Sequence, residues 1–298
     1  MKIKLVEVGL RDGLQNESVT LPTEVKKEIA VRLLHAGVKH LEVSSFVSPK
    51  WIPQLKDAEE LFHLLPVRDD VTYRALVPNL KGLTRALMTP ASEYAVFMSA
   101  SESHNLKNIN KNIADTLITI KEVVQLATEK GKPVRGYVST VFGCPYEGNI
   151  AMSQVVHICE QLIEMGIYEI SLGDTIGVAT PKRVKEVIQS VRQSVPLHQL
   201  AGHFHDTRGM GVVNSYVAVE EGITTLDSAI GGLGGCPYAP GASGNVSTED
   251  LVYLFDREGI ETGLNLTELN ETSLFLQEIF AKPLPSKVFQ SYVAQKEA

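Results

Sequence analysis

The chain has 298 residues, 44% of them hydrophobic and 21% charged, with a formal net charge of −7 at pH 7. A chain of this length can bury a substantial core without disulfides or structural metals. The acidic balance argues against nucleic acid and anionic membranes as partners, so local positive charge would have to hold any anionic ligand.

Short β-branched runs alternate with amphipathic segments along the chain, a pattern typical of strands followed by helices. The predicted strands are residues 3–8, 40–44, 72–77, 94–99, 134–142, 168–172, 200–205 and 225–229. The predicted helices between them include residues 23–35, 56–64, 113–129, 153–165, 181–194 and 212–220. Four of these helices are followed by glycines that suit a left-handed C-terminal cap: Gly37, Gly131, Gly166 and Gly222.

Eight strand–helix alternations without a Pro/Ser-rich linker predict an α/β fold, a single (β/α)8 TIM barrel of about residues 1–260. A doubly wound open sheet is the alternative, but it would normally carry a glycine-rich phosphate loop after its first strand. This chain has Gly-Leu-Arg-Asp-Gly there, at residues 9–13. A C-terminal extension follows at about residues 261–298, with a further helix at 266–280 and a polar, proline-punctuated tail at 282–298. We expect one catalytic domain, 1–298, whose extension packs across the barrel or against a second subunit.

The amino-terminal segment and the cysteines indicate a cytoplasmic protein. Residues 1–7 lack the apolar core and cleavage site of a secretory signal, and they are not Arg/Ser-rich like a transit peptide. No stretch reaches the ~18 to 20 apolar residues that span a bilayer. The three cysteines, Cys144, Cys159 and Cys236, cannot all pair within one chain, so we expect free thiols in a reducing compartment.

Polar residues follow the strands at the end where barrel enzymes place their chemistry. Arg11 and Asp12 follow the first strand, Glu42 lies on the second, and Asp174 follows the sixth. His203 and His205 end the seventh strand, and a glycine-dense loop with Cys236 follows the eighth, before Asn245. These positions predict that the ionisable groups gather at one end of the barrel.

His203 and His205 are the sharpest local signal, because residues two apart on a strand point to the same face. Two imidazoles with oxygen donors nearby suit Mg²⁺, Mn²⁺ or Co²⁺ better than a thiolate-rich zinc site. The His-x-His pattern alone is more often a pair of core or surface histidines. The other ligands of such a metal must come from the polar residues at the ends of the other strands.

Arg11 and Asp12 could form a surface ion pair worth under ~1 kcal/mol. At the mouth of the barrel, however, Asp12 would offer a hard oxygen to a metal and Arg11 a fork to a carbonyl or carboxylate. Glu42 lies within an apolar run, and a closed barrel has no free edge, so an inward Glu42 must be paired or functional.

Two further positions leave structural and catalytic roles open. Asp174 is equally compatible with capping the following turn and with catalysis. Cys236 could be a turn cysteine, or its glycine-dense loop could close over a ligand and deliver the thiol. Cys144 and Cys159 are expected to be unreactive.

Five segments resemble the 3-hydroxy-3-methylglutaryl-CoA (HMG-CoA) lyase family, in the order in which that family carries them. They are residues 6–17, 45–51, 135–139, 170–177 and 232–245. The last of these, Gly-Leu-Gly-Gly-Cys-Pro-Tyr-Ala-Pro-Gly-Ala-Ser-Gly-Asn, is the strongest match and distinguishes the lyases from related metal-dependent barrels. One departure is Thr207-Arg208-Gly209-Met210, where many lyases have Tyr-Gly-Gln after His-Asp-Thr.

The resemblance implies cleavage of HMG-CoA to acetyl-CoA and acetoacetate by metal-assisted retro-Claisen chemistry. It implies a divalent cation, Mg²⁺ or Mn²⁺, and its ligands would be Asp12, His203, His205 and Asn245. Asn245 as a ligand comes from the resemblance alone. Arg11 would bind the thioester carbonyl, and Glu42 would orient Arg11 or the ligand shell. Cys236 would protonate the enolate, and the base that takes the hydroxyl proton could be Asp12, a metal-bound histidine or Asp174.

Two alternatives remain beside the lyase. One is an acyl-CoA condensing synthase or an aldolase of the same barrel group, and the other is a metal-binding barrel that has lost activity and serves as an interaction module. The full set of site residues argues against the inactive barrel. The resemblance and the extra C-terminal helix also indicate a homodimer whose ligand is a small acyl-CoA.

Overall fold

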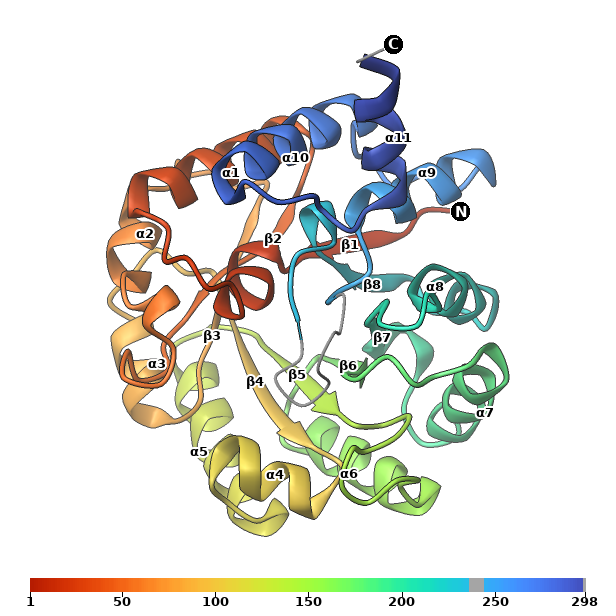
Figure 1. Cartoon of the computed structure of the whole chain (residues 1–298). Helices are drawn as coiled ribbons and strands as arrows, with labels where there is room; N and C mark the ends of the chain where they lie inside the picture. Colours follow the sequence, from red (N-terminus) through yellow and green to blue (C-terminus); the bar gives the residue numbers. More distant parts are fainter. Residues whose placement is uncertain (236–243, 297–298) are drawn as a thin grey trace.

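The computed structural model describes residues 1–235 and 244–296 of the chain. Eight parallel strands close into a barrel in chain order, with helices around its outside (Figure 1). The strands are β1 (Lys4–Glu7), β2 (His40–Ser45), β3 (Thr72–Leu76), β4 (Glu93–Ser99), β5 (Val134–Ser139), β6 (Glu169–Asp174), β7 (Leu200–Phe204) and β8 (Thr225–Ser228). Because β1 also pairs with β8, with Lys4 opposite Thr225, the barrel prediction is confirmed and the open doubly wound sheet is excluded.

The outer layer contains the helices in the order that the sequence predicts, with additional short ones. They are α1 (Thr23–His35), α2 (Ala58–Leu64), α3 (Leu80–Ala86), α4 (Glu102–Ile109), α5 (Ile113–Glu129), α6 (Met152–Glu164), α7 (Pro181–Val191), α8 (Gly211–Glu220), α9 (Thr248–Arg257), α10 (Leu266–Phe280) and α11 (Lys287–Lys296). Among the described residues no helix is long and apolar enough to cross a membrane.

Most predicted boundaries agree with the structure to within a few residues. The glycine caps are confirmed, since Gly37, Gly131, Gly166 and Gly222 all have positive φ. The strand predicted at 134–142 is too long: β5 ends at Ser139. Thr140 takes φ +60°, which turns the chain out of the extended conformation.

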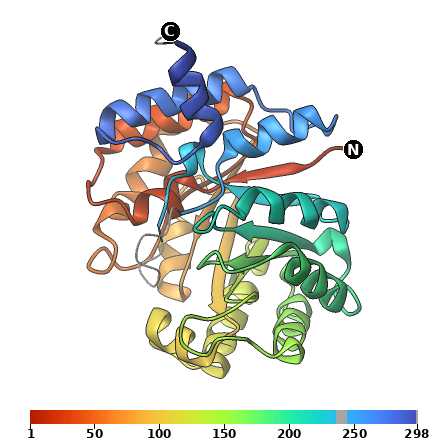
Figure 2. The same ribbon diagram turned by 45° about the vertical axis from the view of Figure 1, so that its right-hand side comes forward.

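The C-terminal extension packs on the barrel beside β1 and β8. Helix α10 lies against α1 and α9, and α11 lies against α9 (Figure 2). The segment between α10 and α11 also covers Gly231, because Ser286 donates its N–H to the Gly231 carbonyl at 3.2 Å. A Cβ at Gly231 would lie 2.6 Å from Leu284 Cδ1, and the backbone there has φ +64°, a conformation that favours glycine. The tail predicted only as polar chain therefore contains a helix and supports the loop after β8.

The inside of the barrel holds a second group of charged residues, at the amino-terminal ends of the strands. Arg74 Nε donates to Glu93 Oε1 at 2.6 Å, and Arg135 Nε donates to Glu169 Oε1 at 2.7 Å. Lys4 Nζ also donates to Glu169, at 2.7 Å. These charged residues are not among those that the sequence analysis singled out, all of which were placed at the opposite end. Charge lies at both ends of the barrel interior.

Candidate active site

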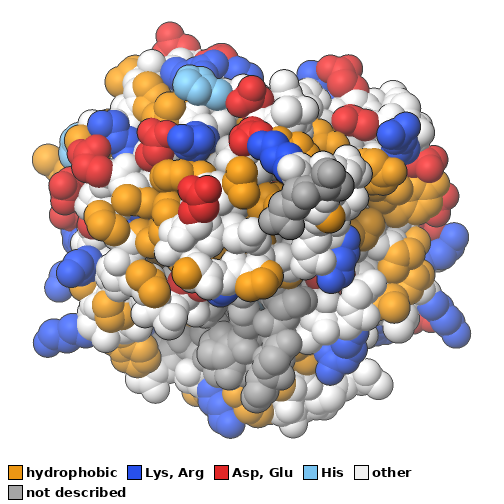
Figure 3. Space-filling model, turned by 45° about the horizontal axis from the view of Figure 1, so that its top comes forward, with side chains coloured by type: hydrophobic (Ala, Val, Ile, Leu, Met, Phe, Trp, Pro, Cys, Tyr) orange, Lys and Arg blue, Asp and Glu red, His pale blue; other side chains and the backbone are white. Residues whose placement is uncertain are grey.

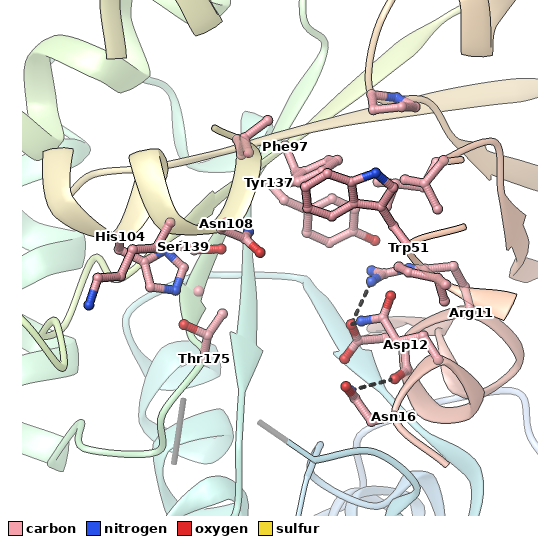
Figure 4. Close-up of a pocket in the computed structure, with 18 of the residues that line it drawn as sticks. Arg11, Asp12, Asn16, Trp51, Phe97, His104, Asn108, Tyr137, Ser139 and Thr175 are labelled. Carbon is pink, nitrogen blue, oxygen red and sulfur yellow. Dashed lines mark hydrogen bonds and ion pairs between the residues drawn. The ribbon is translucent and has the colours of Figure 1, made fainter. Parts of the chain in front are cut away.

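A cavity of about 680 Å³ opens at the carboxyl ends of the strands. Figure 4 shows Arg11 and Asp12 on one side of it and Ser139 and Thr175 on the other. Its other lining residues include Trp51, Lys107, Lys111, Tyr137, His203 and His205. This is the end of the barrel at which sequence reasoning placed the site.

The turn after β1 directs Arg11 and Asp12 into this cavity. The Val8 carbonyl accepts the backbone N–H groups of Arg11, Asp12 and Gly13 at 3.1, 2.7 and 3.2 Å, which tightens residues Gly9–Gly13 into one π-helical turn. The turn lies so close to the loop after β8 that a Cβ on Gly13 would be 2.9 Å from Leu233 Cβ. The turn after the first strand and the loop after the last strand thus meet at the site.

Two carboxylates and a tyrosine hold Arg11 in place. Its Nε donates to Glu42 Oε1, and its Nη1 donates to Asp12 Oδ1 at 2.5 Å. Glu42 is fully buried, and its second oxygen accepts the Tyr137 hydroxyl at 2.6 Å. The expectation that an inward Glu42 must be paired is therefore confirmed. Among the described residues Arg11 Nη2 makes no hydrogen bond, which leaves it for a ligand in the cavity.

Asp12, His203 and His205 converge at the cavity floor, with one ligand-type atom of each within 4.8 Å of the others. Burial favours the neutral acid at Asp12, but Arg11 and the two imidazoles outweigh it and lower the pKa of Asp12 to about 2. Burial lowers the pKa of His205 to about 3, so its ring is neutral at pH 7 and keeps a lone pair. One anionic oxygen and two imidazole nitrogens form a donor set that fits a divalent cation.

Asn245 joins this group from the other side of the glycine-dense loop. Its backbone forms a bridge with His205, and its Nδ2 donates to Asp12 Oδ2 at 2.8 Å and to the Leu233 carbonyl at 3.2 Å. The four residues predicted as metal ligands are therefore brought together. A metal bond from the Asn245 amide oxygen stays a prediction.

Asp174 has a capping role, one of the two roles that the sequence left open. Its two carboxylate oxygens accept the backbone N–H groups of Val178 and Ala179, both at 2.9 Å. Burial raises the pKa of Asp174 above its usual value. A part in catalysis stays a prediction for Asp174. Cys236 lies outside the described residues.

Sequence reasoning missed two side chains that hold the site, Tyr137 and Asp227. The Tyr137 ring meets His203 edge-on, with 6.1 Å between the ring centroids and an angle of 81°. Asp227 Oδ2 lies 3.2 Å from His203 Nδ1. Asp227 could have been found, because it is an acidic residue inside a short strand of a closed barrel, the same signal that drew attention to Glu42.

The cavity carries its own positive charge. Lys107, at the end of α4, and Lys111, after it, both line the wall. Figure 3 shows acidic and basic side chains intermixed on one face of the molecule, with no field of a single sign. An anionic ligand would therefore be held by these local cations and by Arg11, in line with the expectation from the net charge.

Known proteins of similar sequence support an identification of the family. The family model described as HMGL-like matches residues 2–276. The hydroxymethylglutaryl-CoA lyase YngG of Bacillus subtilis is 47% identical over 291 residues, which cover 98% of this chain and 97% of that protein.

Solved structures lead to the same group. The crystal structure of the Bacillus subtilis HMG-CoA lyase has a TM-score of 0.96 at 47% identity, covering 98% of both chains. An HMG-CoA lyase from Acinetobacter baumannii, solved in complex with coenzyme A and 3-methylmalate, has a TM-score of 0.93 at 40% identity, covering 97% of this chain and 94% of that one. By sequence and by fold, this chain belongs to the HMGL-like family.

Proposed function

We propose that this chain is a carbon–carbon lyase that cleaves HMG-CoA to acetyl-CoA and acetoacetate. The observation that carries the proposal is the group Asp12, His203 and His205, which lies beside Arg11 at the floor of one cavity. Relatives named for this reaction cover nearly the whole chain. We also propose that residues 1–298 form one catalytic domain.

The chemistry of the site follows from where negative charge develops. The bond between C2 and C3 breaks when the C3 hydroxyl loses its proton and the electron pair moves to C2, next to the thioester. A bound Mg²⁺ or Mn²⁺, held by Asp12, His203, His205 and Asn245, would make that hydroxyl more acidic. Arg11 Nη2 would donate to the thioester carbonyl, where the enolate charge collects.

Glu42 would act through Arg11. It accepts from Arg11 Nε and from the Tyr137 hydroxyl, so the guanidinium is fixed before substrate arrives. Preorganised donors are worth more than donors that must be ordered during the reaction, because they cost no reorganisation. We propose Glu42 as a positioning residue for Arg11.

Two protons must move. Cys236 is our candidate to protonate C2 of the enolate, on the strength of its place in the glycine-dense loop. For the hydroxyl proton, Asp12 and the histidines are better placed than Asp174, because both oxygens of Asp174 already accept backbone N–H groups. Asp174 would then support the site by shaping the loop after β6, which carries Thr175 into the cavity.

The remaining parts of the proposal concern the ligand's other end and the assembly. Lys107 and Lys111 would pair with phosphate oxygens of the CoA moiety at the cavity wall. A homodimer in the cytoplasm is the form in which we expect the enzyme to act.

The test is an assay of purified protein with HMG-CoA and Mg²⁺ or Mn²⁺, followed by acetoacetate release. We expect equal amounts of acetoacetate and acetyl-CoA, and loss of both when EDTA is added. Cys236→Ser should lower turnover far more than it weakens substrate binding. A matched control is Cys159→Ser, whose thiol is buried on α6 away from the cavity.

Two results would count against the lyase. Release of free CoA from acetyl-CoA and a keto acid, without cleavage of HMG-CoA, would favour the condensing synthase. Metal binding without turnover of any acyl-CoA would favour an inactive barrel.

A further inference from the structure

Asp227 occupies the centre of the barrel, one layer below the proposed metal ligands. It lies on β8 and its side chain is fully buried. Its Oδ2 accepts the Ser171 hydroxyl at 2.6 Å and lies 3.2 Å from His203 Nδ1. Arg135 approaches from below, with Nη2 3.0 Å from Oδ1 and Nη1 3.3 Å from Oδ2. One carboxylate thus joins a metal-ligand histidine to a buried arginine.

The contact decides which nitrogen of His203 carries the proton. A carboxylate accepts hydrogen bonds and cannot donate one when it is ionised, so it requires a proton on Nδ1. The proton on Nδ1 leaves Nε2 with the lone pair that a cation shared with Asp12 and His205 would need. Carboxylate partners of metal-bound histidines fix the tautomer and the ring orientation in this way.

Arg135 keeps Asp227 ionised and in place. An ionised carboxylate without a partner in the barrel interior would be costly. The guanidinium is itself fixed by Glu169 at 2.7 Å and by the face of the Tyr137 ring, whose centroid lies 4.9 Å away. Tyr137 also meets His203 edge-on, so the imidazole is restrained on two sides.

We propose that Asp227, held by Arg135 and Ser171, is a positioning residue that sets the affinity of the site for its divalent cation by fixing the Nδ1–H tautomer of His203. This inference rests on the metal site in the proposed function. It adds a residue that the motifs of the chain did not indicate, and it assigns a function to the Arg135–Asp227 ion pair, which would otherwise only stabilise the fold.

The variant Asp227→Asn is nearly isosteric, so it keeps the packing of the barrel interior and removes the charge that would fix the tautomer of His203. Arg135 Nη1 and the Ser171 hydroxyl both donate to Oδ2, the oxygen beside His203, so the amide oxygen of the variant is favoured at that position. That oxygen carries no charge, so it accepts the His203 Nδ1–H less strongly than the carboxylate does and holds the tautomer less firmly.

The experiment titrates Mn²⁺ into the full-length parent and into Asp227→Asn, with free Mn²⁺ measured by electron paramagnetic resonance. We expect the dissociation constant to rise about 10- to 100-fold in the variant, the usual effect of removing such a partner. Excess Mn²⁺ should restore part of the turnover with unchanged KM. The control is Glu93→Gln, a barrel-interior carboxylate bound to Arg74 and not to His203, which should bind Mn²⁺ as the parent does.

A second measurement needs no variant. The imidazole nitrogens of the metal-free parent, isotope-labelled and observed by NMR at a pH of about 8, above the ordinary histidine pKa, report the tautomer directly. Protonated Nδ1 in His203 supports the proposal. Protonated Nε2, or a Mn²⁺ affinity of Asp227→Asn within twofold of the parent, overturns it. If the parent does not cleave HMG-CoA the proposed reaction fails, yet the spectrum and the Mn²⁺ titration still decide the role of Asp227.

Discussion

The two ends of the barrel interior use the same residue types in opposite ways. At the amino-terminal end, Lys4, Arg74 and Arg135 face Glu93, Glu169 and Asp227, so three cations meet three carboxylates. At the carboxyl end, one cation, Arg11, meets two carboxylates, Asp12 and Glu42, beside two histidines. The charges of the first group cancel, and we call it the closed group. The second group, Arg11, Asp12, Glu42, His203 and His205, has one negative charge in excess and faces a cavity, and we call it the open group.

This difference teaches how to distinguish structural charge from functional charge inside a barrel. Buried charges that are fully paired satisfy one another and need no ligand. A carboxylate in excess, next to imidazole nitrogens, is a group that a cation from outside the chain can complete. Asp227 is the residue that contacts both groups.

The largest effect should follow from breaking the open group. His205→Ala should lower turnover about a thousandfold or more, since a metal supplies several kcal/mol of charge stabilisation. The free energy of unfolding should change by only about 1 kcal/mol, because His205 Nδ1 has no hydrogen-bond partner among the described residues and its removal orphans no donor. Steady-state kinetics and urea unfolding check the two halves. A large loss of stability would instead show that His205 stabilises the fold, as the residues of the closed group do.

The closed group should respond in the opposite way. Arg74→Met leaves Glu93 buried without its cation, and the free energy of unfolding should fall by about 3 kcal/mol, because the Tyr168 hydroxyl still donates to Glu93 at 2.6 Å. Mn²⁺ affinity and KM should not change in the folded fraction. Combining Arg74→Met with Glu93→Leu should restore most of the stability, as measured by urea unfolding. A weaker Mn²⁺ site in either variant would contradict the division between the two ends.

The open group could be placed from the sequence, and the closed group could not. Arg11, Asp12, His203 and His205 lie at or just after the carboxyl ends of strands, and the barrel rule alone gathers residues at those positions. Arg74 pairs with Glu93, and Arg135 with Glu169, because each faces the other across neighbouring strands. That pairing depends on strand register, which the spacing of residues along the chain does not reveal.

The helices show the same limit. Helices α1, α5 and α10 were predicted to the residue because they run for three or more turns with regular apolar spacing and clear ends. Helices α3 and α4 were not predicted, since α3 is short and contains Gly82, and α4 is mostly polar. These two helices are stabilised by packing on the barrel more than by their own sequence.

One further buried carboxylate, Glu249, gives a smaller, pH-dependent effect on stability. Glu249 accepts the Gly231 N–H with both oxygens and also the Ser247 hydroxyl at 2.7 Å, and no cation is bound to it among the described residues. Burial, partly offset by these donors, raises the pKa of Glu249 from 4.5 to about 7. Below about 4.5 both the folded and the unfolded chain hold the proton, and above about 7 neither does. Between these values only the folded chain holds it, so unfolding releases a proton and stability falls as the pH rises.

Glu249→Gln removes this titration. The free energy of unfolding of the parent, minus that of Glu249→Gln, should decrease by about 1.4 kcal/mol per pH unit between those two pKa values. Guanidinium unfolding at a series of pH values measures the difference, in which titrations common to both proteins cancel. Glu271→Gln is a half-buried control on α10; hydrogen bonds from Lys296 and Tyr292 lower the pKa of Glu271, so this variant should not show the same fall with pH. A difference that does not vary with pH would show that Glu249 is ionised throughout.

The smallest effect is expected at the departure from the family pattern. Arg208 Nη1 donates to the Ile176 carbonyl at 2.9 Å and to the Gly177 carbonyl at 3.0 Å, so it ties the loop after β6 to the loop after β7. The residue is exposed, so these two bonds should contribute only about 1 kcal/mol to the order of the loop. Because that loop carries Thr175 into the cavity, Arg208→Tyr should raise KM about two- to fivefold and leave Mn²⁺ affinity unchanged. Arg192→Tyr, at the exposed end of α7, is the matched control and should leave KM as it is. A change in Mn²⁺ affinity in Arg208→Tyr would mean that the loop after β7 shapes the metal site itself. Arg208 would then have to be counted with the open group.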